Sequence, residues 1–306
     1  MTSNLQDPSR PSVLITGCSK GSAGNALALE FAARGFRTFA TGRTRNAVSN
    51  LEEKGIETFI LDVTKPESIA ALKDEITRVT GGTLNILFNN AGALYEAPAI
   101  EADSARVRSM FDANVFGLFD MVSAFTPLLL AAVPSSKQPP TIVNTASVLA
   151  RLPFPFSSAY NATKAAVVSY SDTLRLEVEP LGLKVVTLYM GEVSTALMAP
   201  GNINFGSDSI YADAEDKVKE RSMKHEKTTM SPEEFARQVV GALDGKASNY
   251  IWKGTNAFGV WLLNAIGSRK VFDGMMKSSV GFNDDELRGN LYQKGQAKHG
   301  VGRSSK

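Results

Sequence analysis

Residues 12–34 read SVLITGCSKGSAGNALALEFAAR, and this stretch decides the fold. Residues 12–16 are short, apolar and of strand type; Gly17, Gly21 and Gly24 follow at once, and the last ten residues have helical spacing. A strand, a glycine loop and a helix in this order let the backbone turn tightly and approach a pyrophosphate at the helix N-terminus. A glycine-rich turn without ligand is the alternative, but the flanking strand and helix favour nucleotide binding.

Strand-like and helical segments alternate along most of the chain. The strand segments are residues 12–16, 37–41, 57–61, 84–88, 141–145, 183–189 and 250–252. Alternation of this kind predicts an α/β fold: a three-layer, doubly wound parallel sheet of about seven strands, called the Rossmann fold. Ligands of such sheets bind at the carboxyl ends of the strands. The residues that directly follow strands are Gly17, Arg43, Asp62, Asn89, Ser147 and Gly191.

The second strand segment ends in a basic sequence. Enzymes that prefer NAD usually place an acid here for the ribose 2′-hydroxyl, but Arg43 and Arg45 stand here without an acid, and Lys20 lies in the glycine loop. Because arginine pairs well with a phosphate dianion, this pattern points to NADP, with Arg43 as the first candidate for the 2′-phosphate. Solvated surface charge is the alternative.

Two further strand ends carry polar residues. Asp62 precedes Val63 and could accept a hydrogen bond from an adenine amino group, or it could cap the turn into the helix that begins at Pro66. Residues 89–92 read NNAG, and their amides could face a cofactor or hold neighbouring loops together. Residues 104–133 are predicted to form one long helix that contains Asn114 and a kink at Pro127.

Tyr160 and Lys164 are four residues apart in a helical stretch, residues 157–176, which reads SSAYNATKAAVVSYSDTLRL. The spacing puts both side chains on one helix face. A phenol has a pKa of about 10, and an adjacent ammonium favours the phenolate, so the pair could form an acid that works near neutral pH. Two ordinary residues of an amphipathic helix are the alternative.

Composition excludes several classes of function. The 306 residues are 43% hydrophobic and 21% charged, with a net charge of +2, so we expect a globular protein without a nucleic-acid partner. A single cysteine, Cys18, allows no internal disulfide and favours a reducing, cytoplasmic location. The two histidines, His225 and His299, lie outside the patterned core, so neither a metal site nor His-dependent triad chemistry is expected.

The chain divides into four parts. We expect a disordered N-terminus (1–11), a Rossmann domain (12–253) with a mobile substrate flap (196–230), a helical extension (254–294) and a disordered basic tail (295–306). No transmembrane helix and no secretory signal is predicted. The apolar helix at 256–266 could belong to the core, to a subunit interface or to a peripheral contact with an intracellular membrane, and core or interface is favoured.

Taken together, residues 12–253 resemble the short-chain dehydrogenase/reductase family. The resemblance rests on the glycine loop after Thr16, on Asp62-Val63, on residues 89–92, on Asn114, and on Ser147 followed by Tyr160-x3-Lys164. Phrases such as NVFG and PFSSAYNATKAA look most like a subgroup with fungal 1-acyl-dihydroxyacetone-phosphate reductases and 17β-hydroxysteroid dehydrogenase-like enzymes. The family pattern has a proline where this chain has Met190, which could loosen the nicotinamide wall.

The resemblance implies roles for individual residues. Tyr160 would donate a proton to the substrate carbonyl, Lys164 would lower the pKa of Tyr160 and hold the ribose, Ser147 would bind the substrate oxygen, and Asn114 would hold a water. The implied contacts to NADPH or NADP+ are made by Gly17, Ser19, Lys20, Gly21, Gly24, Arg43, Asp62, Val63, Asn89, Ala91, Gly92, Tyr160, Lys164, Val193 and Thr195.

These inferences predict an NADPH-dependent oxidoreductase that reduces a ketone or aldehyde of a lipophilic small molecule. The pocket is predicted from apolar residues near the strand ends, which could equally belong to the core: Leu149, Phe154, Met190, Leu197 and Met198. A basic patch in the flap (Lys217, Lys219, Arg221, Lys224) would favour a phosphorylated substrate, although a solvated helix face is the preferred interpretation. A homo-oligomer is expected, and a non-redox cyclase or isomerase and a non-catalytic NADP-binding scaffold are the alternatives.

Overall fold

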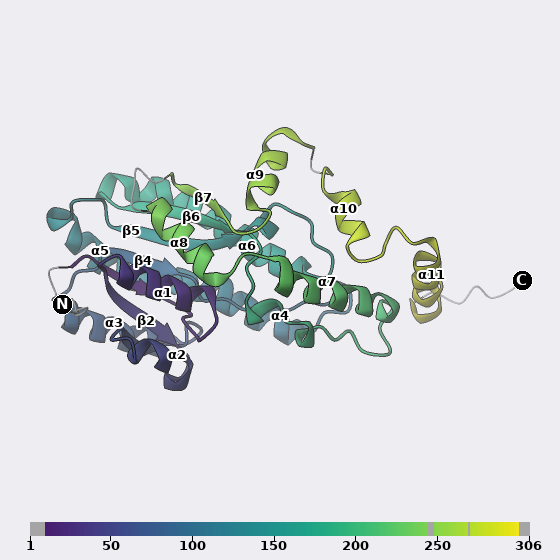
Figure 1. Cartoon of the computed structure of the whole chain (residues 1–306), viewed down its shortest axis with the longest axis horizontal. Coiled ribbons are helices and arrows are strands. Elements are labelled where there is room, and N and C mark those ends of the chain that lie inside the picture. The colour runs from purple at the N-terminus through teal and green to yellow at the C-terminus, as the bar shows by residue number, and fades with distance from the viewer. Residues whose placement is uncertain (1–9, 244–247, 269, 300–306) are drawn as a thin grey trace, which may run out of the picture.

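Seven parallel strands form one sheet in the order β3-β2-β1-β4-β5-β6-β7 in the computed structural model of the chain (Figure 1). The structure describes residues 10–243, 248–268 and 270–299. The order in which strands are added to the sheet reverses between β1 and β4, which is where a doubly wound sheet opens a crevice for a ligand. The strands are β1 (Ser12–Ile15), β2 (Arg37–Gly42), β3 (Glu57–Ile60), β4 (Ile86–Asn89), β5 (Thr141–Ser147), β6 (Lys184–Met190) and β7 (Tyr250–Lys253).

Helices cover both faces of the sheet, so the predicted three layers are confirmed. Alternation along β1 shows the division, since Val13 and Ile15 belong to one hydrophobic core and Leu14 to the other. The first core is formed with α1 (Ala23–Ala33), α2 (Arg45–Glu52) and α8 (Pro232–Leu243). The second is formed with α3 (Pro66–Thr80), α5 (Gly117–Ala132) and α6 (Ser158–Val178). Burial of both faces explains why the strands are apolar throughout.

The predicted long helix at 104–133 is divided by a π-helical turn. The pieces are α4 (Ser104–Phe111), a π-helix (Asp112–Phe116) and α5. At Gly117, where α5 begins, a Cβ would lie 2.5 Å from the backbone oxygen of Val63, so only glycine permits this approach of the helix to the loop after β3. The π-turn contains Asn114, in keeping with the frequent occurrence of such turns at functional sites.

The same stretch is relevant to the prediction that the chain has no transmembrane helix. Residues Ser104–Ser135 are long and apolar enough to cross a membrane by length and composition, contrary to the sequence-based expectation. Half of the most apolar window is buried inside the fold, and a core helix of a soluble protein satisfies the same criterion. The stretch is therefore weak evidence for a span.

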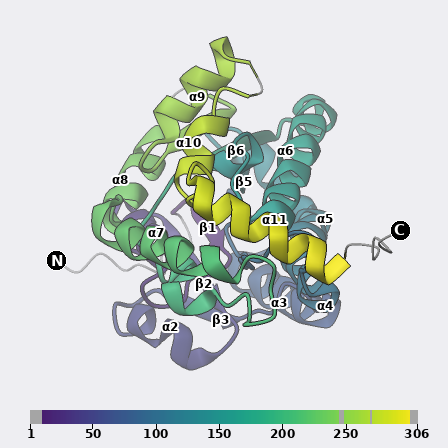
Figure 2. The ribbon, with the colours of Figure 1, turned by 90° about the vertical axis from the view of Figure 1, so that its right-hand side faces the viewer.

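Four helices from the C-terminal part of the chain lie beyond one end of the sheet. They are α7 (Glu215–Thr228), α9 (Ala257–Ile266), α10 (Asp273–Ser278) and α11 (Asp285–His299). Figure 2 shows these four helices on the side of the molecule that faces the viewer. In α9, Ala257 and Val260 are buried, whereas Phe258 and Ile266 are 69% and 76% exposed. The predicted core contact of 256–266 is thus confirmed for one face, and its interface and membrane contacts stay predictions.

The predicted disordered ends need correction where the structure describes them. Residues 295–299 continue α11, so the tail does not begin at 295. At the other end, the Arg10 guanidinium donates a hydrogen bond to the Gly35 oxygen at 2.6 Å, and the Pro11 oxygen accepts one from the Arg37 amide at 2.9 Å. Residues 10 and 11 therefore belong to the folded domain, while 1–9 and 300–306 lie outside the described residues.

Candidate active site

A cavity of about 440 Å³ lies at the carboxyl ends of the strands. Loops after β1, β2, β3 and β4 form its walls, together with the ends of β5 and β6. Thr145 lines this cavity, and its buried hydroxyl has no hydrogen-bond partner within the described structure. The predicted cofactor residues that line the cavity are Gly17, Ser19, Lys20, Gly21, Arg43, Asp62, Val63, Ala91, Gly92, Tyr160, Lys164 and Thr195.

The glycine loop packs closely against neighbouring backbone at Gly17 and Gly24, which leave no room for a side chain. Gly17 has a φ of 75°, and a Cβ there would lie 2.8 Å from the Cα of Ala91. A Cβ on Gly24 would lie 2.4 Å from the Gly17 oxygen, so Gly24 packs α1 against the loop and does not line the cavity. The Asn90 side chain donates to the oxygens of Thr16 and Gly17 at 2.9 and 3.2 Å and fixes the loop to β4. The N-terminus of α1 thereby faces space suited to a pyrophosphate.

Arg43 and Lys20 are exposed and line the cavity. Arg45 does not line it, and its guanidinium Nε lies 3.3 Å from a carboxylate oxygen of Glu52. Of the two arginines after β2, only Arg43 is therefore placed to meet a ligand phosphate.

Asp62 combines the two roles left open by the sequence. Its Oδ1 accepts hydrogen bonds from the Thr64 hydroxyl at 2.7 Å and the Thr64 amide at 3.1 Å, which caps the turn before α3. The Thr64 hydroxyl lowers the pKa of Asp62, so the group stays ionised at neutral pH. Because Asp62 also lines the cavity, the cap leaves it in reach of a ligand.

Two predicted cofactor residues are placed differently. Asn89 is buried within β4, where its side chain donates to the Asn144 amide oxygen at 2.9 Å between adjacent strands, and it does not line the cavity. Its neighbour Asn90, the first residue after β4, lines the cavity instead. Val193 lines a second, neighbouring cavity and not this one.

Tyr160 and Lys164 lie in the first half of α6, on one face as predicted. The Lys164 ammonium lies 5.6 Å from the centroid of the Tyr160 ring and donates a hydrogen bond to the backbone oxygen of Thr145 at 2.8 Å. Burial raises the pKa of Tyr160 to about 12, against a smaller opposing effect of the Ser147 hydroxyl, and burial lowers the pKa of Lys164 to about 8. The expected depression of the tyrosine pKa is therefore wrong, because desolvation dominates.

Ser147 and Asn114 flank this pair. Ser147 is the last residue of β5, and its hydroxyl lies 3.4 Å from the Met190 oxygen and accepts from the Leu149 amide at 3.1 Å. The Asn114 side chain joins Ala93 to α6: it accepts from the Ala93 amide at 2.7 Å and donates to the Thr163 hydroxyl at 3.1 Å. These bonds fix the loop after β4, and the predicted water relay through Asn114 stays a prediction.

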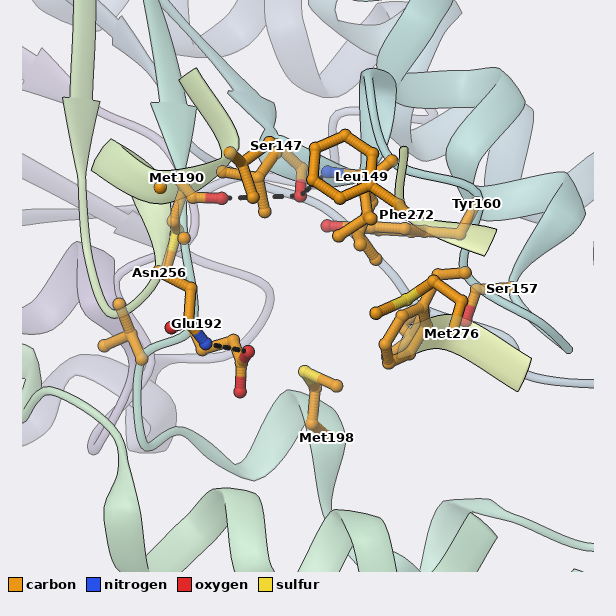
Figure 3. Close-up of a pocket in the computed structure, with 18 of the residues that line it drawn as sticks. Ser147, Leu149, Ser157, Tyr160, Met190, Glu192, Met198, Asn256, Phe272 and Met276 are labelled. Carbon is orange, nitrogen blue, oxygen red and sulfur yellow. Dashed lines mark hydrogen bonds between the residues drawn. The ribbon is translucent and has the colours of Figure 1, made fainter. Parts of the chain in front are cut away.

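The second cavity, of about 240 Å³, is mostly apolar and touches Ser147 and Tyr160 (Figure 3). All five residues predicted for the substrate pocket line it: Leu149, Phe154, Met190, Leu197 and Met198. The remaining wall comes from α9 and α10, through Val260, Leu263 and Met276. Leu197 and Met198 belong to the first turn of residues 196–230, so the start of this segment borders the cavity, and its role as a mobile substrate flap stays a prediction.

Comparisons with known proteins agree with this geometry. The family model for short chain dehydrogenases matches residues 11–204. The chain belongs to the short-chain dehydrogenase family. It is 37% identical over 262 residues to the short-chain dehydrogenase virD of Hypocrea virens, covering 85% of this chain and 89% of that protein. It is 43% identical over 187 residues to the NADPH-dependent 1-acyldihydroxyacetone phosphate reductase of Schizosaccharomyces pombe, and that match spans 61% of each chain.

Solved short-chain dehydrogenases share the fold. A structure from Streptomyces avermitilis superposes with a TM-score of 0.69 at 25% identity and covers 96% of this chain and 99% of its own. A Burkholderia cenocepacia structure in complex with NADP has a TM-score of 0.69 at 22% identity, covering 88% of this chain and 98% of its own.

This short-chain dehydrogenase also contains site residues that the sequence did not indicate. Glu192 lines the apolar cavity, and its carboxylate lies 2.9 Å from Nδ1 of His225. His225 is only 5% exposed, so placing it outside the core was wrong. The preferred interpretation of Arg221 as part of a solvated helix face is also wrong, because its guanidinium contacts the buried Glu96 carboxylate at 2.5 Å. These contacts join α7 to loops that are distant in the sequence, so the periodicity of a single segment could not have predicted them.

Proposed function

We propose that this short-chain dehydrogenase reduces a ketone or aldehyde of a lipophilic small molecule to an alcohol, with NADPH as the reductant. The position of Tyr160 carries the proposal, because Tyr160 lines both the cofactor cavity and the apolar cavity. A proton donor at the junction of two cavities can serve a reaction between their occupants.

Each residue of the site has a separate role in the proposed reaction. When bound, NADPH supplies the hydride. Tyr160, which burial keeps protonated at neutral pH, donates its hydroxyl proton to the carbonyl oxygen that receives the electron pair. Ser147 donates a hydrogen bond to the same oxygen and stabilises its developing charge. Lys164, between Tyr160 and the Thr145 oxygen, supplies positive charge beside the phenol.

The residues of the large cavity support NADP as the cofactor. Arg43 and Lys20 bring two positive charges to one wall, and no acid follows β2 to bind a ribose 2′-hydroxyl. The name of the S. pombe relative and the NADP in the B. cenocepacia structure agree with this choice.

The experiment is oxidation of NADPH by the purified protein against a panel of lipophilic ketones and aldehydes, with Tyr160→Phe as the matched variant. We expect turnover by the wild type and a loss of at least about 100-fold in kcat for Tyr160→Phe, with NADPH affinity retained. Equal turnover by the two proteins would reject Tyr160 as proton donor, and NADPH binding without reduction of any carbonyl would reject the function.

A further inference from the structure

The substrate cavity contains one charged side chain among the described residues that line it, the carboxylate of Glu192. The other polar groups on its walls are the side chains of Ser147, Ser157, Tyr160, Thr195 and Asn256. Figure 3 shows Glu192 and Asn256 on one side of the cavity, with Tyr160 and Ser157 on the other. The proposed function assigns Tyr160 and Ser147 to the reacting carbonyl, and it assigns nothing to Glu192.

The surrounding structure holds Glu192 in a fixed orientation. Asn256 donates a hydrogen bond to Oε1 at 2.8 Å, and His225 lies 2.9 Å from Oε2. The backbone of Glu192 exchanges two hydrogen bonds of 3.0 Å with Thr255. Asn256 has a φ of 64°, a left-handed conformation that asparagine adopts more readily than most other non-glycine residues. Such support is what a group that orients a ligand requires.

Glu192 retains capacity for a ligand. Its side chain is 38% exposed, and an ionised carboxylate offers about four acceptor positions, of which the two neighbours use two. Burial alone would raise the pKa of Glu192, but the hydrogen bonds from His225 and Asn256 outweigh it and lower the pKa, so the group is ionised at neutral pH. The cavity therefore presents free acceptor positions and no free charged donor.

The nearby cations do not offset this for an anionic ligand. Arg221 lies with its guanidinium carbon 4.2 Å from the centroid of the Phe154 ring, and Phe154, not Arg221, lines the cavity. The Arg221 charge is already matched by Glu96. Lys217 and Lys219 pair with Glu220 and Glu215 on their own helix, and neither lines the cavity. Arg221 also interacts electrostatically with Glu192, but no described cation lines the cavity. A phosphate or carboxylate there would thus meet Glu192 without a cation in direct contact.

We propose that Glu192 selects substrates by accepting a hydrogen bond from a hydroxyl group remote from the reacting carbonyl. The substrate class is a neutral, lipophilic hydroxy-ketone, and phosphate esters and carboxylates of the same size are rejected. Apolar walls bind the carbon skeleton, Ser147 and Tyr160 bind the carbonyl, and Glu192 sets the position of the hydroxyl. This inference rests on the proposed function for the placement of the carbonyl.

Binding of unreactive alcohols tests the proposal without turnover. Dissociation constants are measured by calorimetry on the NADPH-saturated protein, with which an alcohol cannot react because its oxidation needs NADP+. Three matched series of increasing chain length are compared: n-alkanols, α,ω-alkanediols and n-alkanoates. We expect one range of chain lengths in which the diol binds about tenfold more tightly than the alkanol, the scale of one hydrogen bond to a charged group. We expect the alkanoate to bind at least about tenfold more weakly than the alkanol.

Two variants assign the effect to Glu192. Glu192→Gln keeps an acceptor without the charge, so it should reduce the diol preference and relieve the rejection of alkanoates. Glu192→Leu should abolish the diol preference. Glu220→Gln makes the same chemical change at an exposed position of α7 outside the cavity, so it is the matched control and should keep the wild-type ratio of the dissociation constants. Thermal unfolding and NADPH affinity report whether each variant is folded.

The wild-type series decides the matter even if a variant does not fold. Equal binding of diol and alkanol at every length, tight binding of alkanoates, or a diol preference that survives in both variants would overturn the proposal. If no ketone is reduced but the diol preference holds, the proposed function fails and the role of Glu192 stands. If ketones are reduced without any hydroxyl preference, the reverse is true.

Discussion

The ammonium of Lys164 lies 5.6 Å from the centroid of the Tyr160 ring, and its hydrogen bond goes to the Thr145 oxygen at 2.8 Å. Burial favours the neutral form of each group. It raises the pKa of Tyr160 to about 12 and lowers the pKa of Lys164 to about 8. A protonated phenol is the form that a carbonyl reductase needs. In this arrangement the tyrosine is therefore ready to donate, and the lysine is the group that titrates near neutral pH.

The first prediction concerns the pH dependence of reduction. Below about pH 8 Lys164 carries its proton and its positive charge assists proton donation by Tyr160, so kcat/KM should fall as the pH rises through about 8. No loss of the Tyr160 proton is expected until near pH 12. Steady-state rates with a ketone across this range check the prediction. A profile that stays flat up to pH 10 would contradict it.

The second prediction is a gain of stability from removing a catalytic residue. Folding lowers the pKa of Lys164 from 10.5 to about 8, so between these values the unfolded chain binds more protons and stability rises with pH. Below pH 8 the burial penalty is present in full. At pH 7 the Lys164→Met variant should therefore have a free energy of unfolding that is higher than the wild-type value by at most about 3 kcal/mol, measured by denaturant titration. The variant should also lose activity.

The control for this substitution is Lys224→Met, at an exposed position of α7. It should change stability by less than about 0.5 kcal/mol. A Lys164→Met protein that is less stable than the wild type at pH 7 would show that the hydrogen bond to Thr145 outweighs the cost of burying the ammonium.

The third prediction separates two arginines that lie two residues apart. Arg43→Ala should weaken NADPH binding by about 10-fold to 100-fold and leave NADH binding nearly unchanged, because only Arg43 of the pair lines the cofactor cavity. Arg45→Ala removes a guanidinium that pairs with Glu52 outside the cavity, so it should affect neither cofactor. Fluorescence titration with both cofactors measures this. An unchanged preference for NADPH in Arg43→Ala rejects the assignment.

The fourth prediction tests how tightly the loop after β6 is held. A Cβ on Gly191 would lie 2.4 Å from the Thr255 oxygen, so Gly191→Ala must push this loop away from the segment after β7. We expect a loss of stability of about 2 kcal/mol, together with weaker substrate binding. At Gly201 a Cβ meets no atom within 4 Å, and Gly201→Ala should be nearly neutral in the same urea titration. Equal stability of the two variants would contradict the close approach.

Sequence alone determined what depends on local spacing. The period of the apolar residues located the strands and most helices, and the four-residue interval placed Tyr160 and Lys164 on one face of α6. The glycine positions and the basic end of β2 predicted the cofactor cavity, because parallel strands bring their carboxyl ends to one edge.

Only the tertiary structure decided which neighbours those residues have. It turned Asn89 into the sheet and Asn90 toward the cavity, and it made burial rather than Lys164 the main influence on the pKa of Tyr160. It also brought α7 and the segment before α9 to Glu192, by contacts between residues 33 and 64 positions apart. Such contacts depend on how finished elements pack and on the water they exclude, and neither is contained in the periodicity of a single segment.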